Sequence, residues 1–297
     1  MSVRIGINPL TWTIDDLPEV GGETSLETCL TEARAAGFEG VELGCKFPRT
    51  APELKAALAP HGLALVSGWY SANLLLRDAA TEFEAMRPHR ELLSALGCDV
   101  VVVAETTRCI HGERGTRLSQ RPVLAPADWP RFAERLDELG GRLRDSGLRL
   151  AYHHHMGTVV QTEDEVDRLM DSCDDDVVSL LLDTGHLTFA GGDPVRAATR
   201  HAARIAHVHC KDVRHAVLAR TLNRDSSFLD AVLDGVFTVP GDGSVDYPSV
   251  LEPIARAGYG GWLVVEAEQD PAVAPSAEYA NLGYRNLRRL ADAAAFA

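Results

Sequence analysis

The sequence predicts a single (β/α)8 barrel, a TIM barrel, that spans residues 1–297 as one domain. Eight short apolar runs alternate with eight longer amphipathic segments, and this number of strand–helix units is enough to close such a barrel. Residues 100–104 and 177–182 are apolar almost throughout, which is typical of parallel strands that are covered by helices. The length would also allow two domains, but no linker or low-complexity segment divides the chain.

Strands and helices are expected to follow one another in regular order. The strands are expected at residues 3–8, 40–44, 64–70, 99–105, 149–155, 177–183, 205–211 and 262–268. The helices are expected at residues 25–36, 51–61, 81–96, 127–146, 163–172, 194–203, 248–257 and 277–295. No glycine-rich phosphate loop follows the first strand, which disfavours an open doubly wound sheet. The connection after the seventh strand, about residues 212–246, is expected to be a long functional loop.

Composition and charge exclude several classes of protein. Lys plus Arg total 29 and Asp plus Glu total 43, a net charge of −14, which disfavours nucleic acid as a partner. No apolar run reaches the ~18 residues of a membrane span, and a strand pattern that starts near residue 3 leaves no room for a signal peptide. The six cysteines are scattered, which indicates reduced thiols. We therefore expect a cytoplasmic protein that binds neither nucleic acid nor membrane.

Histidines and carboxylates gather at the carboxyl ends of the last four expected strands, where barrel enzymes carry their chemistry. Because side chains alternate along a strand, His153 and His155 share a face, and His154 points away. By the same rule His207, His209 and Lys211 share a face. One ligand from each strand predicts a metal site of His153, Asp183, His209 and Glu266. This mixed nitrogen and oxygen set suits Mn²⁺, Co²⁺, Fe²⁺ or Zn²⁺ better than Mg²⁺ or Ca²⁺.

Several of these residues also have a purely structural interpretation. Asp183 could cap a helix, and His207 could be an ordinary buried residue of the core. Glu268 and Lys211 could form an ion pair without a chemical role. The joint occurrence at four consecutive strand ends favours the metal site.

Three motifs resemble strands six to eight of the xylose isomerase-like superfamily of sugar isomerases, epimerases and dehydratases. They are Leu181-Leu-Asp-Thr-Gly-His186, His207-Val-His-Cys-Lys-Asp212 and Gly261-Trp-Leu-Val-Val-Glu266. Other stretches resemble the inosose dehydratase family within it, notably Gly6-Ile-Asn-Pro-Leu-Thr-Trp12 and Tyr152-His-His-His-Met-Gly-Thr158. Most members of the superfamily place a glutamate where this chain has His153, but inosose dehydratases are similar to this chain in that respect.

The resemblance implies a hydro-lyase that removes water from 2-keto-myo-inositol in inositol catabolism and gives a trihydroxycyclohexane-1,2-dione. It also implies Mn²⁺ or Co²⁺ as the activator, and it associates glutathione with activity. The reaction needs a Lewis acid for the enolate, a base and an acid. His155 and His186 are the acid and base candidates, with Lys211 and Glu268 as alternates. Contacts to a cyclitol substrate are expected from Asn8, Trp12, Glu42, Lys46 and Trp69.

Other activities stay open at this point. A ketose or sugar epimerase or isomerase could use the same metal set. A metal phosphodiesterase is the third alternative, which the net charge of −14 disfavours. A homo-oligomer is compatible with the sequence.

Overall fold

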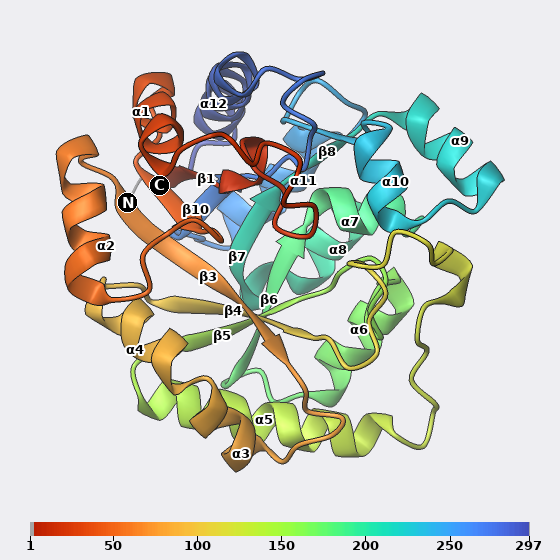
Figure 1. Ribbon diagram of the computed structural model, residues 1–297. Coiled ribbons are helices and arrows are strands. Elements are labelled where there is room, and N and C mark those ends of the chain that lie inside the picture. The colour runs from red at the N-terminus through yellow and green to blue at the C-terminus, as the bar shows by residue number, and fades with distance from the viewer. Residues whose placement is uncertain (1–2, 297) are drawn as a thin grey trace.

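Eight parallel strands close into a barrel that helices surround in the computed structural model, which describes residues 3–296 (Figure 1). The order of neighbours around the barrel is β1-β10-β7-β6-β5-β4-β3-β2. The strands are β1 (Arg4–Ile7), β2 (Gly40–Leu43), β3 (Ala64–Ala72), β4 (Val100–Glu105), β5 (Arg149–His153), β6 (Val178–Asp183), β7 (Ile205–Cys210) and β10 (Trp262–Val265). The predicted (β/α)8 barrel is therefore confirmed, and every predicted strand is present.

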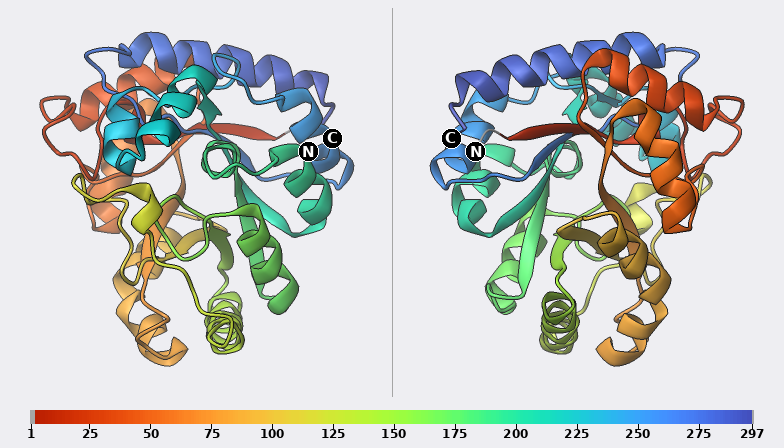
Figure 2. Two further views of the ribbon diagram at one scale, coloured as in Figure 1. Left: turned by 90° about the vertical axis from the view of Figure 1, so that its right-hand side faces the viewer. Right: turned by 90° about the vertical axis from the view of Figure 1, so that its left-hand side faces the viewer.

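The helices form the outer layer, and α12 packs beside α1 along one side of the barrel (Figure 2). They are α1 (Leu26–Ala36), α2 (Ala51–Leu58), α3 (Ala79–Ala85), α4 (Arg87–Ala95), α5 (Trp129–Asp145), α6 (Glu163–Ser172), α7 (Thr184–Phe189), α8 (Pro194–His201), α9 (His215–Arg224), α10 (Phe228–Leu233), α11 (Tyr247–Arg256) and α12 (Ser276–Ala293). Short 3-10 turns are η1 (Pro9–Thr11), η2 (Ala59–His61), η3 (Leu118–Gln120) and η4 (Ala202–Arg204). Within residues 3–296, no helix combines the length and apolarity that crossing a membrane requires.

Apolar side chains fill the inside of the barrel in layers. One cluster consists of Val66, Trp262 and Val264, and a second contains Val102, Ala151, Leu181 and Ala206. Gly40 makes room for the first cluster, because a Cβ atom there would lie 2.7 Å from Val66 and 2.8 Å from the Trp262 ring. The packed interior leaves only the ends of the barrel open for a site.

Two helical predictions need correction. The expected helix at residues 81–96 is divided into α3 and α4, which meet at Met86. Pro88 lies in the first turn of α4, where its missing N–H is tolerated, whereas it would interrupt a continuous helix. Helix α7 was not expected, because it follows β6 without an intervening turn and its N-cap is the last residue of the strand, Asp183.

The segment at residues 212–246 is ordered structure and not the long loop that we expected. It contains α9, α10 and an antiparallel pair of short strands, β8 (Asp212–Val213) and β9 (Phe237–Thr238). Its apolar side chains, including Phe228 and Phe237, form a cluster with Ile14 and Phe189. Asp212 anchors the segment, because its buried carboxylate accepts hydrogen bonds from four backbone amides, those of Val213, Gly241, Gly243 and Val245.

The Asp212→Ala substitution should lower the free energy of unfolding by at least about 2 kcal/mol, because it leaves buried amides without an acceptor. Urea denaturation measures this loss. Asp234→Ala is the matched control, since Asp234 is half exposed and lies 3.9 Å from its partner Arg224, and it should change stability by less than about 0.5 kcal/mol. Equal losses in the two variants would contradict the anchoring role of Asp212.

Candidate metal centre

A cavity of about 330 Å³ opens at the carboxyl ends of the barrel strands. This volume suits a small-molecule ligand. Its lining includes eight of the predicted site residues: Asn8, Glu42, Trp69, His153, His155, His209, Glu266 and Glu268. Eight residues that were predicted from the strand ends therefore lie together at one cavity.

The four predicted metal ligands converge beside this cavity. The Asp183 Oδ2 atom lies 3.8 Å from His153 Nε2 and 3.5 Å from His209 Nδ1. Glu266 Oε2 lies 2.7 Å from His209 Nδ1. All four side chains are buried, and their ligand-type atoms lie within 4.8 Å of one another. One divalent cation could contact all four.

Two of these atoms are left unsatisfied by the protein. Among the described residues, Asp183 Oδ2 and His209 Nδ1 form no hydrogen bond, although both atoms are buried; the 2.7 Å contact between His209 Nδ1 and Glu266 Oε2 does not have the geometry of a hydrogen bond. Buried polar atoms without a partner are costly and uncommon. Both point to the same place, and a metal ion there would satisfy both. The donor set and the two unpaired atoms therefore fit a bound metal.

Hydrogen bonds orient both histidine rings for this purpose. His153 Nδ1 donates to the His154 carbonyl oxygen at 2.5 Å, which leaves the lone pair of Nε2 facing Asp183. His209 Nε2 lies 3.2 Å from a carboxylate oxygen of Glu42 and donates to it, which leaves Nδ1 facing Asp183 and Glu266. Metal-binding histidines usually donate their second N–H in this way. Burial and the neighbouring His209 lower the pKa of His153 well below its usual value, so this ring is neutral.

Asp183 has two roles in this arrangement. Its Oδ1 atom accepts a hydrogen bond of 2.7 Å from the His186 amide and caps α7, whereas Oδ2 faces the candidate metal position. The helix-cap interpretation and the ligand interpretation therefore do not exclude each other.

The rest of the Asp-Thr-Gly-His motif holds Lys211. The Thr184 hydroxyl accepts from the Lys211 amide at 3.1 Å and lies 2.8 Å from the Lys211 carbonyl oxygen. The stem of Lys211 passes over Gly185, where a Cβ atom would lie 2.4 Å from Lys211 Cγ. His186 Nε2 accepts from Lys211 Nζ at 2.9 Å. Each residue of the motif after Asp183 thus contacts the same lysine.

Lys211 and Glu268 form the ion pair that the sequence allowed. Lys211 is fully buried, and its Nζ atom lies 2.6 Å from Glu266 Oε1 and 2.8 Å from Glu268 Oε2. Although burial alone would lower the pKa of Lys211, the carboxylates of Glu266 and Glu268 raise it above its ordinary value. Burial raises the pKa of Glu268 to about 7, while Lys211 opposes this shift and Glu266 adds to it. Of the pair, Glu268 lines the cavity and Lys211 lies behind it.

His155 and His186 occupy different positions relative to the cavity. His155 lines it, and because Nδ1 donates to the Met156 carbonyl oxygen at 2.8 Å, Nε2 is the unprotonated nitrogen. Burial lowers the pKa of His155 well below its usual value, so the ring is neutral. The ring of His186 lies behind it, with 3.8 Å between centroids, and is not part of the cavity lining. In this arrangement His186 contacts Lys211 and not a bound substrate.

Two residues that we expected at the substrate lie elsewhere. The Trp12 ring is buried outside the cavity, and its Nε1 atom donates to Glu32 on α1 at 2.6 Å. Lys46 Nζ donates to backbone carbonyl oxygens in the loop at residues 21–24, including that of Gly22 at 2.6 Å. The prediction that Trp12 and Lys46 line the substrate cavity is therefore corrected, because Glu32 on α1 holds the Trp12 ring, and backbone carbonyl oxygens of the first loop hold Lys46, away from it.

Asn8 and Glu42 line the cavity, but their polar atoms are already paired. Asn8 Nδ2 donates to Glu42 Oε2 at 2.7 Å and to Glu266 Oε2 at 3.0 Å. Glu42 Oε1 also lies 2.8 Å from His207 Nε2. These residues hold the carboxylates in place, so they are less available to a substrate than we expected. Trp69 also lines the cavity, with its ring in edge-to-face contact with those of His153 and His155.

The strand-end argument missed polar residues that loops bring to the cavity. His111, in the connection after β4, lies with its ring centroid 4.9 Å from that of His155. Asp16, in the connection after β1, lies 3.9 Å from His111, and Arg49 is a further lining residue. The two-residue alternation of side chains along a strand cannot predict the direction of these side chains, because they lie in loops.

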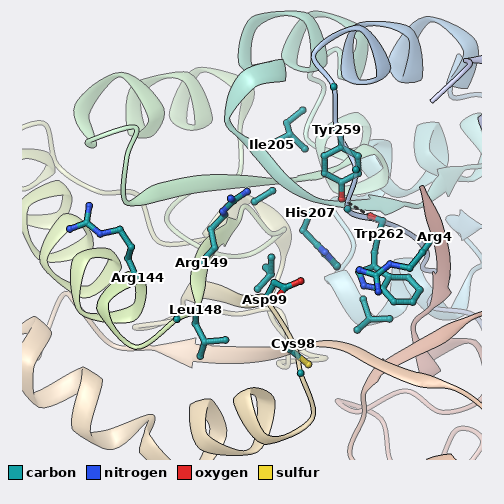
Figure 3. A pocket seen from close by; sticks show the side chains of 18 of the residues that line it. Arg4, Cys98, Asp99, Arg144, Leu148, Arg149, Ile205, His207, Tyr259 and Trp262 are labelled. Carbon is teal, nitrogen blue, oxygen red and sulfur yellow. Dashed lines mark hydrogen bonds between the residues drawn. The ribbon is translucent and has the colours of Figure 1, made fainter. Parts of the chain in front are cut away.

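A second and larger cavity, of about 800 Å³, lies at the opposite end of the barrel (Figure 3). Arg4, Arg149 and Trp262, which begin their strands, are among its lining residues. None of the four metal-ligand candidates lines it. In barrel enzymes this amino-terminal face contributes to stability and the opposite face carries the chemistry, so the smaller cavity is the candidate active site.

Comparison with known proteins shows the family. Residues 30–290 match the family described as xylose isomerase-like TIM barrel, and the chain belongs to it. The chain is 53% identical to the rhizopine catabolism protein MocC of Rhizobium meliloti, over 100% of this chain and 91% of that protein. It is 47% identical to the inosose dehydratase of Geobacillus thermodenitrificans, over 94% of each chain. A structure of the IOLI protein, described with a binding zinc atom, superimposes with a TM-score of 0.69 at 17% identity and 98% coverage of both chains, which shows a shared fold.

The Asp183→Asn substitution should separate the two roles of Asp183. Asparagine can still cap α7, but the charge that faces the metal position is lost. We expect metal affinity to fall on the order of 10- to 100-fold or more, measured by elemental analysis after dialysis, with thermal unfolding of the metal-free protein nearly unchanged. Full metal occupancy of this variant would remove Asp183 from the ligands.

Proposed function

We propose that this protein is a metal-dependent hydro-lyase, an inosose dehydratase, that removes water from 2-keto-myo-inositol and gives a trihydroxycyclohexane-1,2-dione. The observation that carries the proposal is the convergence of His153, Asp183, His209 and Glu266 beside a cavity, with two buried ligand-type atoms left unpaired. The 47% identity to an inosose dehydratase over 94% of both chains supports the substrate and its place in inositol catabolism.

We assign the metal to these four residues and propose Mn²⁺ or Co²⁺ as the ion. Two imidazole nitrogens and two carboxylates suit such borderline cations. When bound, the metal would act as a Lewis acid that stabilises the enolate as it forms. Glu42 contributes by holding the His209 ring, and Asn8 contributes by bridging Glu42 and Glu266.

The chemical roles follow from which residues reach the cavity. His155 lines the cavity, and its Nε2 is unprotonated because Nδ1 donates to the Met156 carbonyl oxygen, so we assign His155 as the general base that takes the proton next to the ketone. Glu268 lines the same cavity, and because burial raises its pKa to about 7 its protonated form is populated near neutral pH, so it is the proposed acid that protonates the departing hydroxyl group. The C–H and C–O bonds break, water leaves, and the enol that remains converts to the dione. His186 and Lys211 do not line the cavity but contact these two residues: Lys211 Nζ lies 2.8 Å from Glu268 Oε2, and the His186 ring packs against that of His155.

Binding of the cyclitol is proposed to use the cavity wall. Trp69 offers a flat apolar surface beside His153 and His155, with ring centroids 5.2 and 5.3 Å away. His111, Asp16 and Arg49 are polar groups of the lining that could pair with hydroxyl groups. Four other statements stay predictions from the sequence. They are that nucleic acid is not a partner, that the protein is a homo-oligomer, that it is cytoplasmic and that glutathione is associated with its activity.

Incubation with 2-keto-myo-inositol tests the activity. With Mn²⁺ or Co²⁺ bound, we expect the ultraviolet absorbance of the conjugated dione to appear. Removal of the metal with EDTA should abolish it, and added Mn²⁺ should restore it. Retained activity in metal-free protein would contradict the metal role. An epimer without dione absorbance would favour the alternative activity, a sugar epimerase or isomerase of the same family.

The His155→Asn substitution should lower kcat by about 10²- to 10⁴-fold, because it removes the proposed general base. Steady-state kinetics measure this loss, and elemental analysis should show unchanged metal content. Unaltered turnover would exclude a chemical role for His155.

A further inference from the structure

Lys211 lies at the centre of a second group of metal-ligand atoms, next to the first. Its Nζ atom lies 2.9 Å from His186 Nε2, 2.6 Å from Glu266 Oε1 and 2.8 Å from Glu268 Oε2. Without the lysine, these three residues form a buried group whose ligand-type atoms lie within 4.8 Å of one another. One imidazole and two carboxylates are a donor set that binds divalent transition metals. An ammonium group thus lies where ligands for a cation converge.

Glu266 belongs to both groups. Its Oε2 atom lies 2.7 Å from His209 Nδ1 in the first group, and its Oε1 atom lies 2.6 Å from Lys211 Nζ in the second. Asp183 Oδ2, at the first metal position, is also 3.9 Å from Lys211 Nζ. Two-metal enzymes hold their ions about 3.5–4 Å apart, and a carboxylate that directs one oxygen to each of two neighbouring cation positions could bridge such a pair. Glu266 has this arrangement.

We propose that the ammonium group of Lys211 occupies the position of a second divalent cation, so that the centre holds one metal ion and one fixed organic cation. The proposal rests on the metal site of the proposed function and is independent of its substrate. A substitution that removes the ammonium group therefore opens a second metal site, with His186, Glu266 and Glu268 as ligands.

The surrounding charge explains why a cation is needed at this position. Glu42, Asp183, Glu266 and Glu268 are four buried carboxylates within one end of the barrel. A single divalent ion cannot offset all of them, and an uncompensated buried charge is strongly unfavourable. The lysine supplies further positive charge that cannot dissociate or be removed by a chelator.

The fold holds the lysine firmly in this position. Thr184 contacts both its backbone amide and its carbonyl oxygen, and Gly185 leaves room for its stem. The Phe237 ring, from β9, lies with its centroid 4.5 Å from Nζ. These contacts come from α7 and from the ordered segment after β7, so two separate parts of the chain enclose one ammonium group.

Metal counting tests the proposal directly. Wild-type protein at saturating Mn²⁺ should hold one ion per chain by elemental analysis. Lys211→Ala should hold two, and electron paramagnetic resonance should show the coupling of two neighbouring Mn²⁺ ions. The double variant Lys211→Ala/Glu268→Gln, which lacks one ligand of the second site, should return to one ion.

Lys46→Ala is the matched control, because Lys46 Nζ contacts backbone carbonyl oxygens outside the cavity, and it should hold one ion. Two ions in the wild type, or one ion in folded Lys211→Ala, would overturn the proposal. If Lys211→Ala unfolds without metal, Mn²⁺ should restore its circular dichroism spectrum, and failure to do so would also overturn it.

The same counts separate this proposal from the proposed function. A wild-type chain that binds no metal would refute both. One ion in the wild type and in every variant would refute the second cation position alone. Inactivity towards 2-keto-myo-inositol would refute the proposed substrate and leave the counts unaffected.

Discussion

Compensation of buried negative charge governs the carboxyl end of this barrel. Glu42, Asp183, Glu266 and Glu268 are each at most 5% exposed, and isolated carboxylates in such surroundings would be very costly. Each carboxylate therefore has its own hydrogen-bond donors or cations. Glu42 and Glu266 each have three such partners: Asn8, His207 and His209 contact Glu42, and Asn8, His209 and Lys211 contact Glu266. Although burial alone would lower the pKa of His209, the carboxylates of Glu266 and Glu42 raise it well above its ordinary value, so the metal-free ring carries positive charge that a metal ion beside Asp183 would replace.

Support for these charges extends well beyond the strands that carry them. His207 contacts Glu42 from the barrel interior, and Glu42 in turn holds the His209 ring. Phe228 and Phe237, from the segment after β7, pack against the ring of His186, with centroids 5.7 and 5.3 Å away. The segment that we expected to be a loop therefore closes the space behind the active-site cavity. The buried carboxylate of Asp212 anchors this segment through hydrogen bonds from four backbone amides.

Sequence reasoning succeeded where the geometry is local. The alternation predicted for a strand at residues 149–155 holds past the observed end of β5 at His153: His153 and His155 line the cavity, whereas His154 accepts a hydrogen bond from the Asp183 amide. It failed for Trp12 and Lys46, because the direction of a loop side chain depends on partners elsewhere, such as Glu32 on α1. His111 was not predicted for the same reason, because it lies in the loop after β4, where no periodic pattern indicates the direction of a side chain.

The sequence by itself determined the barrel, the order of its strands along the chain and the strand ends at which the candidate metal ligands gather. These follow from the spacing of apolar residues and from the two-residue period of strands, which act over short stretches. Only the tertiary structure decided that Asp183 both caps α7 and faces the candidate metal position, and that Lys211 lies between Glu266 and Glu268. Lys211 and Glu268 are 57 residues apart, and closure of the barrel brings them into contact, so no local pattern could specify their pairing.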